Sequence, residues 1–122
     1  MKNVMPQELE VWYLIPAIRK ELAKVFISDY GLSQRKAAEC LGITEAAISQ
    51  YLKSKRGNEI KFSDEALSEI KRSARDVVER KDDVTEKIYH LCVLLRKSKA
   101  MCAIHRLQDK RIPKECSICL KD

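Results

Sequence analysis

The sequence predicts an all-α protein, and three observations lead to this fold class. Apolar residues recur at spacings of three and four in several stretches, as they do on one face of an α-helix. The chain has only three Gly and three Pro in 122 residues, too few for the many turns of an all-β domain. Hydrophobic residues form 45% of the chain, too large a share for a disordered protein. We therefore expect a helical bundle.

The N-terminal segment has a helical pattern that a proline interrupts. Its apolar residues follow the helical spacing from Val11 through Leu22 to Phe26. Pro16 lies inside this pattern and removes one hydrogen-bond donor from the backbone. We expect either a short helix over about 7–14 and a longer one over about 16–28, or one kinked helix. Gly31 is expected to end it.

Residues 33–53 predict two short helices joined by a tight turn. Ser33 is a good N-cap for a helix over 34–41, and Gly42 ends that helix because glycine accepts a positive φ. Thr44 then caps a helix over 45–53. The positions that would pack the two helices together are small or apolar: Ala37, Ala38, Leu41, Ile43, Ile48 and Tyr51.

Two longer helices are predicted next. Ser63 can cap a helix that ends near Arg80, and acidic residues in its first turn suit the helix dipole. Asp83 can cap another helix, with Val84, Ile88, Leu91, Leu94 and Leu95 on one side. From about residue 98 the periodicity is lost, cysteines appear, and Pro113 argues against a helix.

A short helix, a tight turn and a second short helix are typical of the helix-turn-helix unit that binds DNA. In such a unit, the residues of the second helix that do not pack inward reach base edges and phosphates. Basic residues after it, and the start of the first helix, lie near phosphates. The candidate DNA-binding residues are Gln34, Arg35, Thr44, Glu45, Ala46, Ser49, Gln50, Lys53, Lys55 and Arg56.

The side chains of the second helix suggest how bases would be read. Gln50 can form two hydrogen bonds with adenine, and Ala46 can contact a thymine methyl group. Glu45 repels phosphate but can accept a hydrogen bond from a cytosine amine. The chain carries a net charge of +6, and its excess of Lys and Arg falls in residues 32–61 and 84–122. These basic blocks fit contact with a polyanion, or simply a solvated surface.

The stretch from Leu32 to Leu52 resembles the phage-repressor-like (Cro-type, XRE) helix-turn-helix. The resemblance extends to archaeal XRE-type transcriptional regulators, in which a Pro-Ala-Ile-Arg stretch, here Pro16 to Arg19, precedes the motif and a cysteine-containing tail follows it. It implies a dimeric DNA-binding regulator with a metal or iron–sulfur site. It also implies a bundle with a C-terminal helical extension and a cysteine-rich tail.

Four of the five cysteines lie in the last third of the chain. Cys92, Cys102, Cys116 and Cys119 have the spacing C-x9-C-x13-C-x2-C, and the final pair can chelate one metal from a tight turn. Cys40 is interpreted as a core residue of the first short helix, and His90 as a surface residue.

Three hypotheses fit the tail cysteines. All four can hold an iron–sulfur cluster, most simply [4Fe–4S], which would respond to redox state or oxygen. Alternatively, the tail holds a structural zinc, bound either by all four cysteines or by Cys102, His105, Cys116 and Cys119, in which case Cys92 is left out. The third hypothesis is thiol or disulfide redox sensing without a metal.

The function we expect is a sequence-specific, dimeric transcriptional regulator that binds a palindromic site in double-stranded DNA. Its domains would be a DNA-binding unit over 1–60 with the motif at 33–53, a dimerisation or linker region over 61–97, and a metal-binding tail over 92–122. The alternative is an interaction module, such as an antitoxin or RNA-binding adaptor, with a structural zinc. No nucleophile–base pair, phosphate loop or paired carboxylates suggest an enzyme or a small-molecule substrate. No membrane span or secretion signal is visible, so we expect a cytoplasmic protein.

Overall fold

The computed structural model describes residues 5–53 and 60–96. Within these residues every regular element is a helix, which confirms the predicted all-α class. The elements in chain order are α1 (Pro6–Leu9), the π-helical segment η1 (Glu10–Leu14), α2 (Ile15–Ser28), α3 (Gln34–Leu41), α4 (Glu45–Lys53), α5 (Asp64–Arg80) and α6 (Val84–Leu95).

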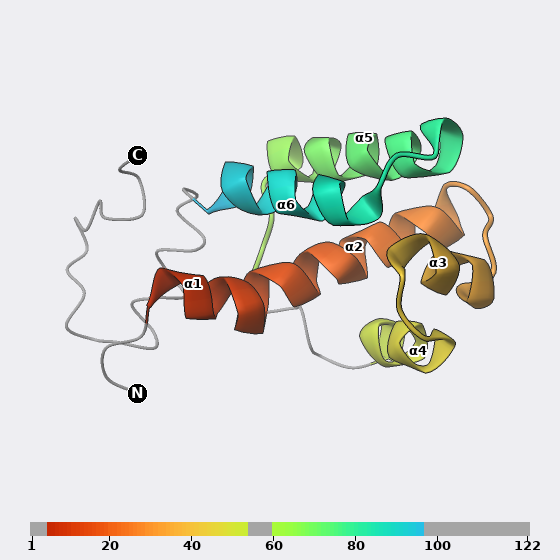
Figure 1. Ribbon diagram of the computed structural model, residues 1–122, viewed down its shortest axis with the longest axis horizontal. Coiled ribbons are helices and arrows are strands. Elements are labelled where there is room, and N and C mark those ends of the chain that lie inside the picture. The colour runs from red at the N-terminus through yellow and green to blue at the C-terminus, as the bar shows by residue number, and fades with distance from the viewer. Residues whose placement is uncertain (1–4, 54–59, 97–122) are drawn as a thin grey trace.

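Helix α2 forms the centre of the bundle. Figure 1 shows α5 and α6 along one side of α2 and the α3–α4 pair along the other, and α2 contacts all four of these helices. Its side chains are buried around most of its circumference, as expected for a helix surrounded by others. Five of them are completely inaccessible to solvent: Ala17, Ile18, Leu22, Ala23 and Phe26.

The N-terminal helical segment continues through Pro16, and α2 over Ile15–Ser28 matches the longer helix predicted over about 16–28. The residues before Pro16 widen into the π-helical segment η1, where the Ile15 N–H donates to the Glu10 carbonyl five residues back. Pro16 itself lies in the first turn of α2. A wider turn accommodates a residue that cannot donate a backbone hydrogen bond, so the helical path continues.

The turn between α3 and α4 forms as the sequence predicts. Ser33 Oγ accepts a hydrogen bond from the Lys36 N–H at 3.1 Å, which caps the start of α3. Gly42 has φ +68°, its N–H donates to Glu39, and the Ile43 N–H donates to the Ala38 carbonyl. These two bonds satisfy carbonyls at the end of α3 that would otherwise lack partners. The chain therefore reverses within three residues before α4 begins.

Helix α4 begins at a capping threonine and packs through one face. Thr44 Oγ1 accepts from the Ala47 N–H at 3.1 Å. Ile48 is completely buried and Tyr51 is 8% exposed, and α4 contacts both α2 and α3. The core thus determines which face of α4 remains at the surface.

Helices α5 and α6 form an antiparallel pair with the predicted caps. Ser63 Oγ accepts from the Ala66 N–H, and Asp83 Oδ1 accepts from the Thr85 N–H. Leu91 and Leu95 of α6 are buried, but Leu94 is 55% exposed, which corrects its predicted place on the packed side. Leu94 and Leu95 are neighbours on the helix, 100° apart, so the packing of α6 selects only one of them.

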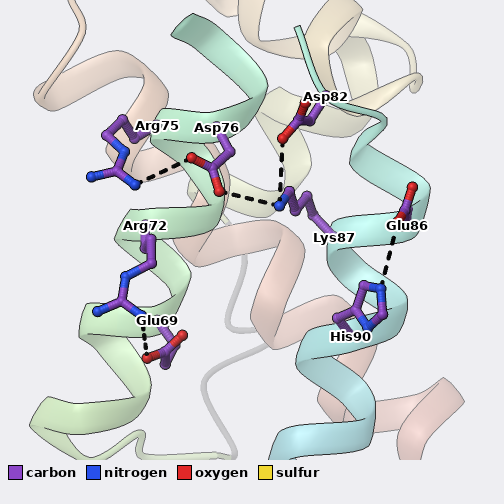
Figure 2. A network of polar contacts seen from close by, with 8 residues as sticks. All are labelled: Glu69, Arg72, Arg75, Asp76, Asp82, Glu86, Lys87 and His90. Atoms are coloured by element: carbon purple, nitrogen blue, oxygen red, sulfur yellow. Dashed lines mark hydrogen bonds and ion pairs between the residues drawn. The ribbon is translucent and has the colours of Figure 1, made fainter. Parts of the chain in front are cut away.

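A polar network links α5 to α6. Figure 2 shows the Asp76 carboxylate of α5 between Arg75 and Lys87, with Lys87 Nζ 3.1 Å from Asp76 Oδ2 and 3.5 Å from Asp82 Oδ2. The hydrogen bond from Lys87 lowers the pKa of Asp76, although burial of the carboxyl acts in the opposite direction. The hydrogen bond to Asp76 raises the pKa of Lys87. Both shifts mean that the charged pair stabilises the fold.

Substitutions at two helix ends are predicted to change the stability of the protein in opposite directions. Gly42 and Lys81 both have positive φ, +68° and +58°, but only glycine adopts this conformation without strain. We expect Gly42→Ala to lower the free energy of unfolding by about 1 kcal/mol and Lys81→Gly to raise it by up to about 1 kcal/mol. Urea denaturation of both variants measures the changes. Loss of stability in Lys81→Gly would contradict this account, since it would show that relief of the strained φ does not outweigh the entropy that glycine adds to the unfolded chain.

Replacing the buried carboxylate tests the α5–α6 network. Asp76 has a lowered pKa, so its contribution is complete above the ordinary value of 3.8 and disappears as the pH falls through the lowered value. We expect Asp76→Asn to reduce the melting temperature at neutral pH, and the difference from wild type to shrink below about pH 3.8. Glu69→Gln is the control, because Glu69 forms an exposed pair with Arg72 in the same helix. A difference that is independent of pH would show that charge is not the cause.

Candidate nucleic-acid interface and the cysteine site

The outer face of α4 carries most of the predicted DNA-binding side chains at the surface. Thr44, Glu45 and Ala46 at its start are exposed, as are Gln50 and Lys53, while Ser49 is partly buried. Figure 1 shows α4 at the edge of the molecule, on the side of α2 away from α5 and α6. Because Ile48 and Tyr51 occupy the inner face, the side chains that could read bases lie together on the outer face.

The start of α3 adds cationic and polar side chains. Gln34 and Arg35 are exposed in its first turn, where free backbone N–H groups favour an anion. Arg35 and Lys36 lie 3.8 Å and 3.4 Å from Glu39 carboxylate oxygens, but all three side chains are more than half exposed. Exposed pairs of this kind are weak, so both cations can exchange Glu39 for a phosphate at little cost.

Two predicted phosphate contacts, Lys55 and Arg56, lie outside the described residues. The described part of the interface is therefore the first turn of α3 and the outer face of α4. It offers hydrogen-bond donors and acceptors in Gln34, Thr44, Ser49 and Gln50, and cations in Arg35, Lys36 and Lys53. This mixture can bind a phosphate backbone and a set of base edges together.

Cys92 is the one member of the predicted four-cysteine set within the described residues, and it belongs to the hydrophobic core. Its exposed fraction is 5%, and it packs in the same cluster as Leu91 and Leu95. Burial, and next the negative charge of Glu10, raise the pKa of its thiol to about 11, although Arg96 and Arg19 act in the opposite direction. Since the thiolate is the form that binds metals, a metal that bound Cys92 would have to displace the thiol proton.

The remaining candidate ligands, Cys102, His105, Cys116 and Cys119, lie outside the described residues. Within residues 5–53 and 60–96, no three His, Cys, Asp or Glu side chains gather as they would around a metal ion. A site that includes Cys92 would have to obtain its other ligands from the tail.

The two remaining interpretations from the sequence agree with the structure. Cys40 is partly buried and packs against the hydrophobic core. His90 is exposed on α6, where its Nε2 lies 3.6 Å from Glu86 Oε1. Both residues lie apart from the exposed face of α4.

Sequence reasoning missed the ion pair between Glu10 and Arg96. Arg96 Nε donates to Glu10 Oε1 at 2.5 Å and its Nη2 to Oε2 at 3.5 Å, which raises the pKa of Arg96. The pair joins η1 to the end of α6. The one signal in the sequence was a carboxylate within an apolar stretch, because a buried acid needs a partner. Its partner lies 86 residues away, so no local pattern could identify it.

Comparison of the chain with family models, with curated proteins and with solved structures gives no match. Among the helices of the described residues, none has the length and the apolar composition that crossing a membrane requires.

Proposed function

We propose that the protein is a sequence-specific DNA-binding transcriptional regulator of the helix-turn-helix type that acts as a homodimer on a palindromic site. The observation that carries this proposal is the α3–turn–α4 unit, whose inner residues are buried and whose outer residues are polar, small or basic. Helix α4 would lie in the major groove as the recognition helix. The start of α3 would contact the phosphate backbone.

Each part of the unit has a role in this proposal. Gln50 has the donor and acceptor that adenine pairs with in the major groove, and Ala46 beside it is small enough to meet a thymine methyl group. Arg35 and Lys53 flank this face and would position the helix through phosphates. The capped ends of α3 and α4 hold the two helices at a constant angle, so the base-reading side chains need little reorganisation on binding.

Exposed apolar side chains support the dimer. Val11, Trp12, Val93 and Leu94 are between 39% and 59% exposed. They lie on η1 and α6, which the Glu10–Arg96 pair joins. Large apolar side chains left exposed to solvent can mark a site of protein–protein contact. A contact here leaves the outer face of α4 free for DNA, because α4 is on the opposite side of α2 from α6.

The cysteine tail would make the regulator responsive to its environment. In one version Cys92, Cys102, Cys116 and Cys119 hold an iron–sulfur cluster, most simply [4Fe–4S], which supplies redox or oxygen sensitivity. In the other, zinc binds Cys102, His105, Cys116 and Cys119 and only stabilises the tail. The burial of Cys92 favours the zinc version, because that version leaves Cys92 in the core.

DNA binding can be tested on duplexes selected from a random-sequence library. We expect Gln50→Ala to relax specificity, since losing a two-bond contact with a base costs about 1–3 kcal/mol of discrimination. Lys55→Ala should weaken binding to all sequences alike and reduce the slope of log affinity against log salt by about 1. Fluorescence anisotropy over a series of salt concentrations measures both effects.

Lys71→Ala is the matched control for these variants. Lys71 is exposed, and it lies on α5, on the other side of α2 from α4. Its replacement should leave both the affinity and the salt dependence nearly unchanged. Failure of the library to yield a preferred duplex, or equal losses in all three variants, would overturn the proposal.

The metal content of Cys92→Ala separates the two versions of the tail site. The protein is purified without oxygen, and its absorption spectrum and its iron, sulfide and zinc contents are measured. A four-cysteine cluster predicts a brown wild type with about four iron and four sulfide per chain, and loss of colour in Cys92→Ala. A zinc site of Cys102, His105, Cys116 and Cys119 predicts a colourless protein with about one zinc per chain in both forms, whereas a four-cysteine zinc site would lose its zinc in Cys92→Ala.

Cys102→Ala serves as the comparison in the same experiment, since both versions use Cys102 and should lose the metal. Circular dichroism checks that Cys92→Ala, which alters a core residue, keeps its helices. Wild-type protein that contains neither iron nor zinc would contradict both versions. The remaining hypothesis would then be thiol chemistry in the tail.

A further inference from the structure

A pocket of about 290 Å³ lies where the N-terminal helical segment meets α6 and the end of α3. Ile15 of α2, Leu41 of α3 and Ile88 of α6 form apolar parts of its wall. Mostly apolar walls with a few polar groups are typical of sites for small molecules, and this volume is at the small end of their range. The pocket therefore suits a compact ligand.

The pocket contains more positively charged than negatively charged side chains. Arg96 is neutralised by Glu10, with which it forms two hydrogen bonds. Arg19 also lines the pocket, and its Nε is buried without a hydrogen-bond partner. Within residues 5–53 and 60–96, no side chain forms an ion pair with Arg19. The described pocket thus has an excess of one positive charge.

An unsatisfied buried donor indicates a missing partner. Leaving such a group without a hydrogen bond costs about 1–3 kcal/mol, and more when the group is charged. A guanidinium group presents parallel N–H donors that match the two oxygens of a carboxylate. A carboxylate beside the Arg19 guanidinium would balance the excess charge, and it would satisfy Nε, which is closed to solvent in this structure, once the side chain shifts toward the ligand.

We propose that this pocket binds a small organic monocarboxylate with a short apolar body. The carboxylate pairs with Arg19, and the body lies against Ile15, Leu41 and Ile88. The pocket can balance one negative charge on a ligand, because Glu10 already neutralises Arg96 and only the charge of Arg19 is left. The apolar wall disfavours an inorganic anion such as phosphate, whose remaining oxygens would lose water without gaining hydrogen bonds.

The position of the pocket connects this ligand to α3. Leu41 is the last residue of α3, directly before the turn at Gly42, and Ile88 belongs to α6. An occupant would contact both helices and favour the arrangement in which they are close. An effect of the ligand on DNA affinity rests on the proposed function, whereas binding of the ligand does not.

Calorimetric titration of the full chain with benzoate tests the proposal, with sodium chloride holding the ionic strength constant. We expect saturable binding of one benzoate per chain. Benzamide has the same shape without the charge. Its affinity should be lower by about tenfold or more, as expected for the loss of a charge-assisted hydrogen bond. Inorganic phosphate should not compete.

Arg19→Met provides the matching change in the protein, because methionine keeps the apolar stem and removes the donors. Benzoate affinity should fall about tenfold or more in this variant. Lys24→Met is the control, since Lys24 lies on the same helix but its side chain is 49% exposed and pairs with Glu21. Circular dichroism verifies that both variants are folded.

Several results would overturn the proposal. They are equal binding of benzoate and benzamide, competition by phosphate, and wild-type affinity in Arg19→Met. The absence of benzoate binding would also overturn it, even where the reason is that a carboxylate of the chain's own tail occupies the pocket. The titration contains no DNA, so its result does not depend on whether the protein binds DNA. Repeating the DNA titration with saturating benzoate then tests the connection to α3 separately.

Discussion

The burial of α2 is the constraint on which the rest of the structure depends. Its apolar side chains extend around most of the helix, and α3, α4, α5 and α6 each cover part of them. Covering one helix on all sides forces the others into two groups, α5 with α6 and α3 with α4 (Figure 1). Removing apolar area from water is the dominant favourable term in folding, so this arrangement follows from the composition of α2.

The two groups around α2 have different surface chemistry. The α3–α4 pair is short, capped at both helix starts and joined by three residues, and its outer face is polar and small. The α5–α6 pair is longer and is held by the Asp76–Lys87 contact between its helices. Although α3 contacts α6, helix α4 lies on the side of α2 away from α6, so the proposed DNA-binding surface and the proposed dimer surface do not compete.

The Glu10–Arg96 pair connects the start of the helical bundle to its end. It is partly buried, and removal of Arg96 alone would leave the largely buried Glu10 carboxylate without its charged partner. Cys92, Arg19 and the pocket lie beside it, so three groups that could respond to a ligand or a metal occupy one small region. Leu41 of α3 also lines this region, which gives it a direct contact with the candidate DNA-binding unit.

The sequence alone determined the local features of this protein. Ser33, Ser63 and Asp83 start helices and Gly42 ends one, because capping depends on a side chain and a backbone group a few residues away. The exposure of the outer face of α4 was also predictable, since Ile48 and Tyr51 mark its inner face. Only the tertiary structure decided that the helical path continues past Pro16, that Leu94 faces solvent and that Cys92 is buried. It alone paired Glu10 with Arg96 and left Arg19 without a partner in the described part of the chain. These features depend on which elements meet in space, and local spacing along the chain carries no information about contacts between distant residues.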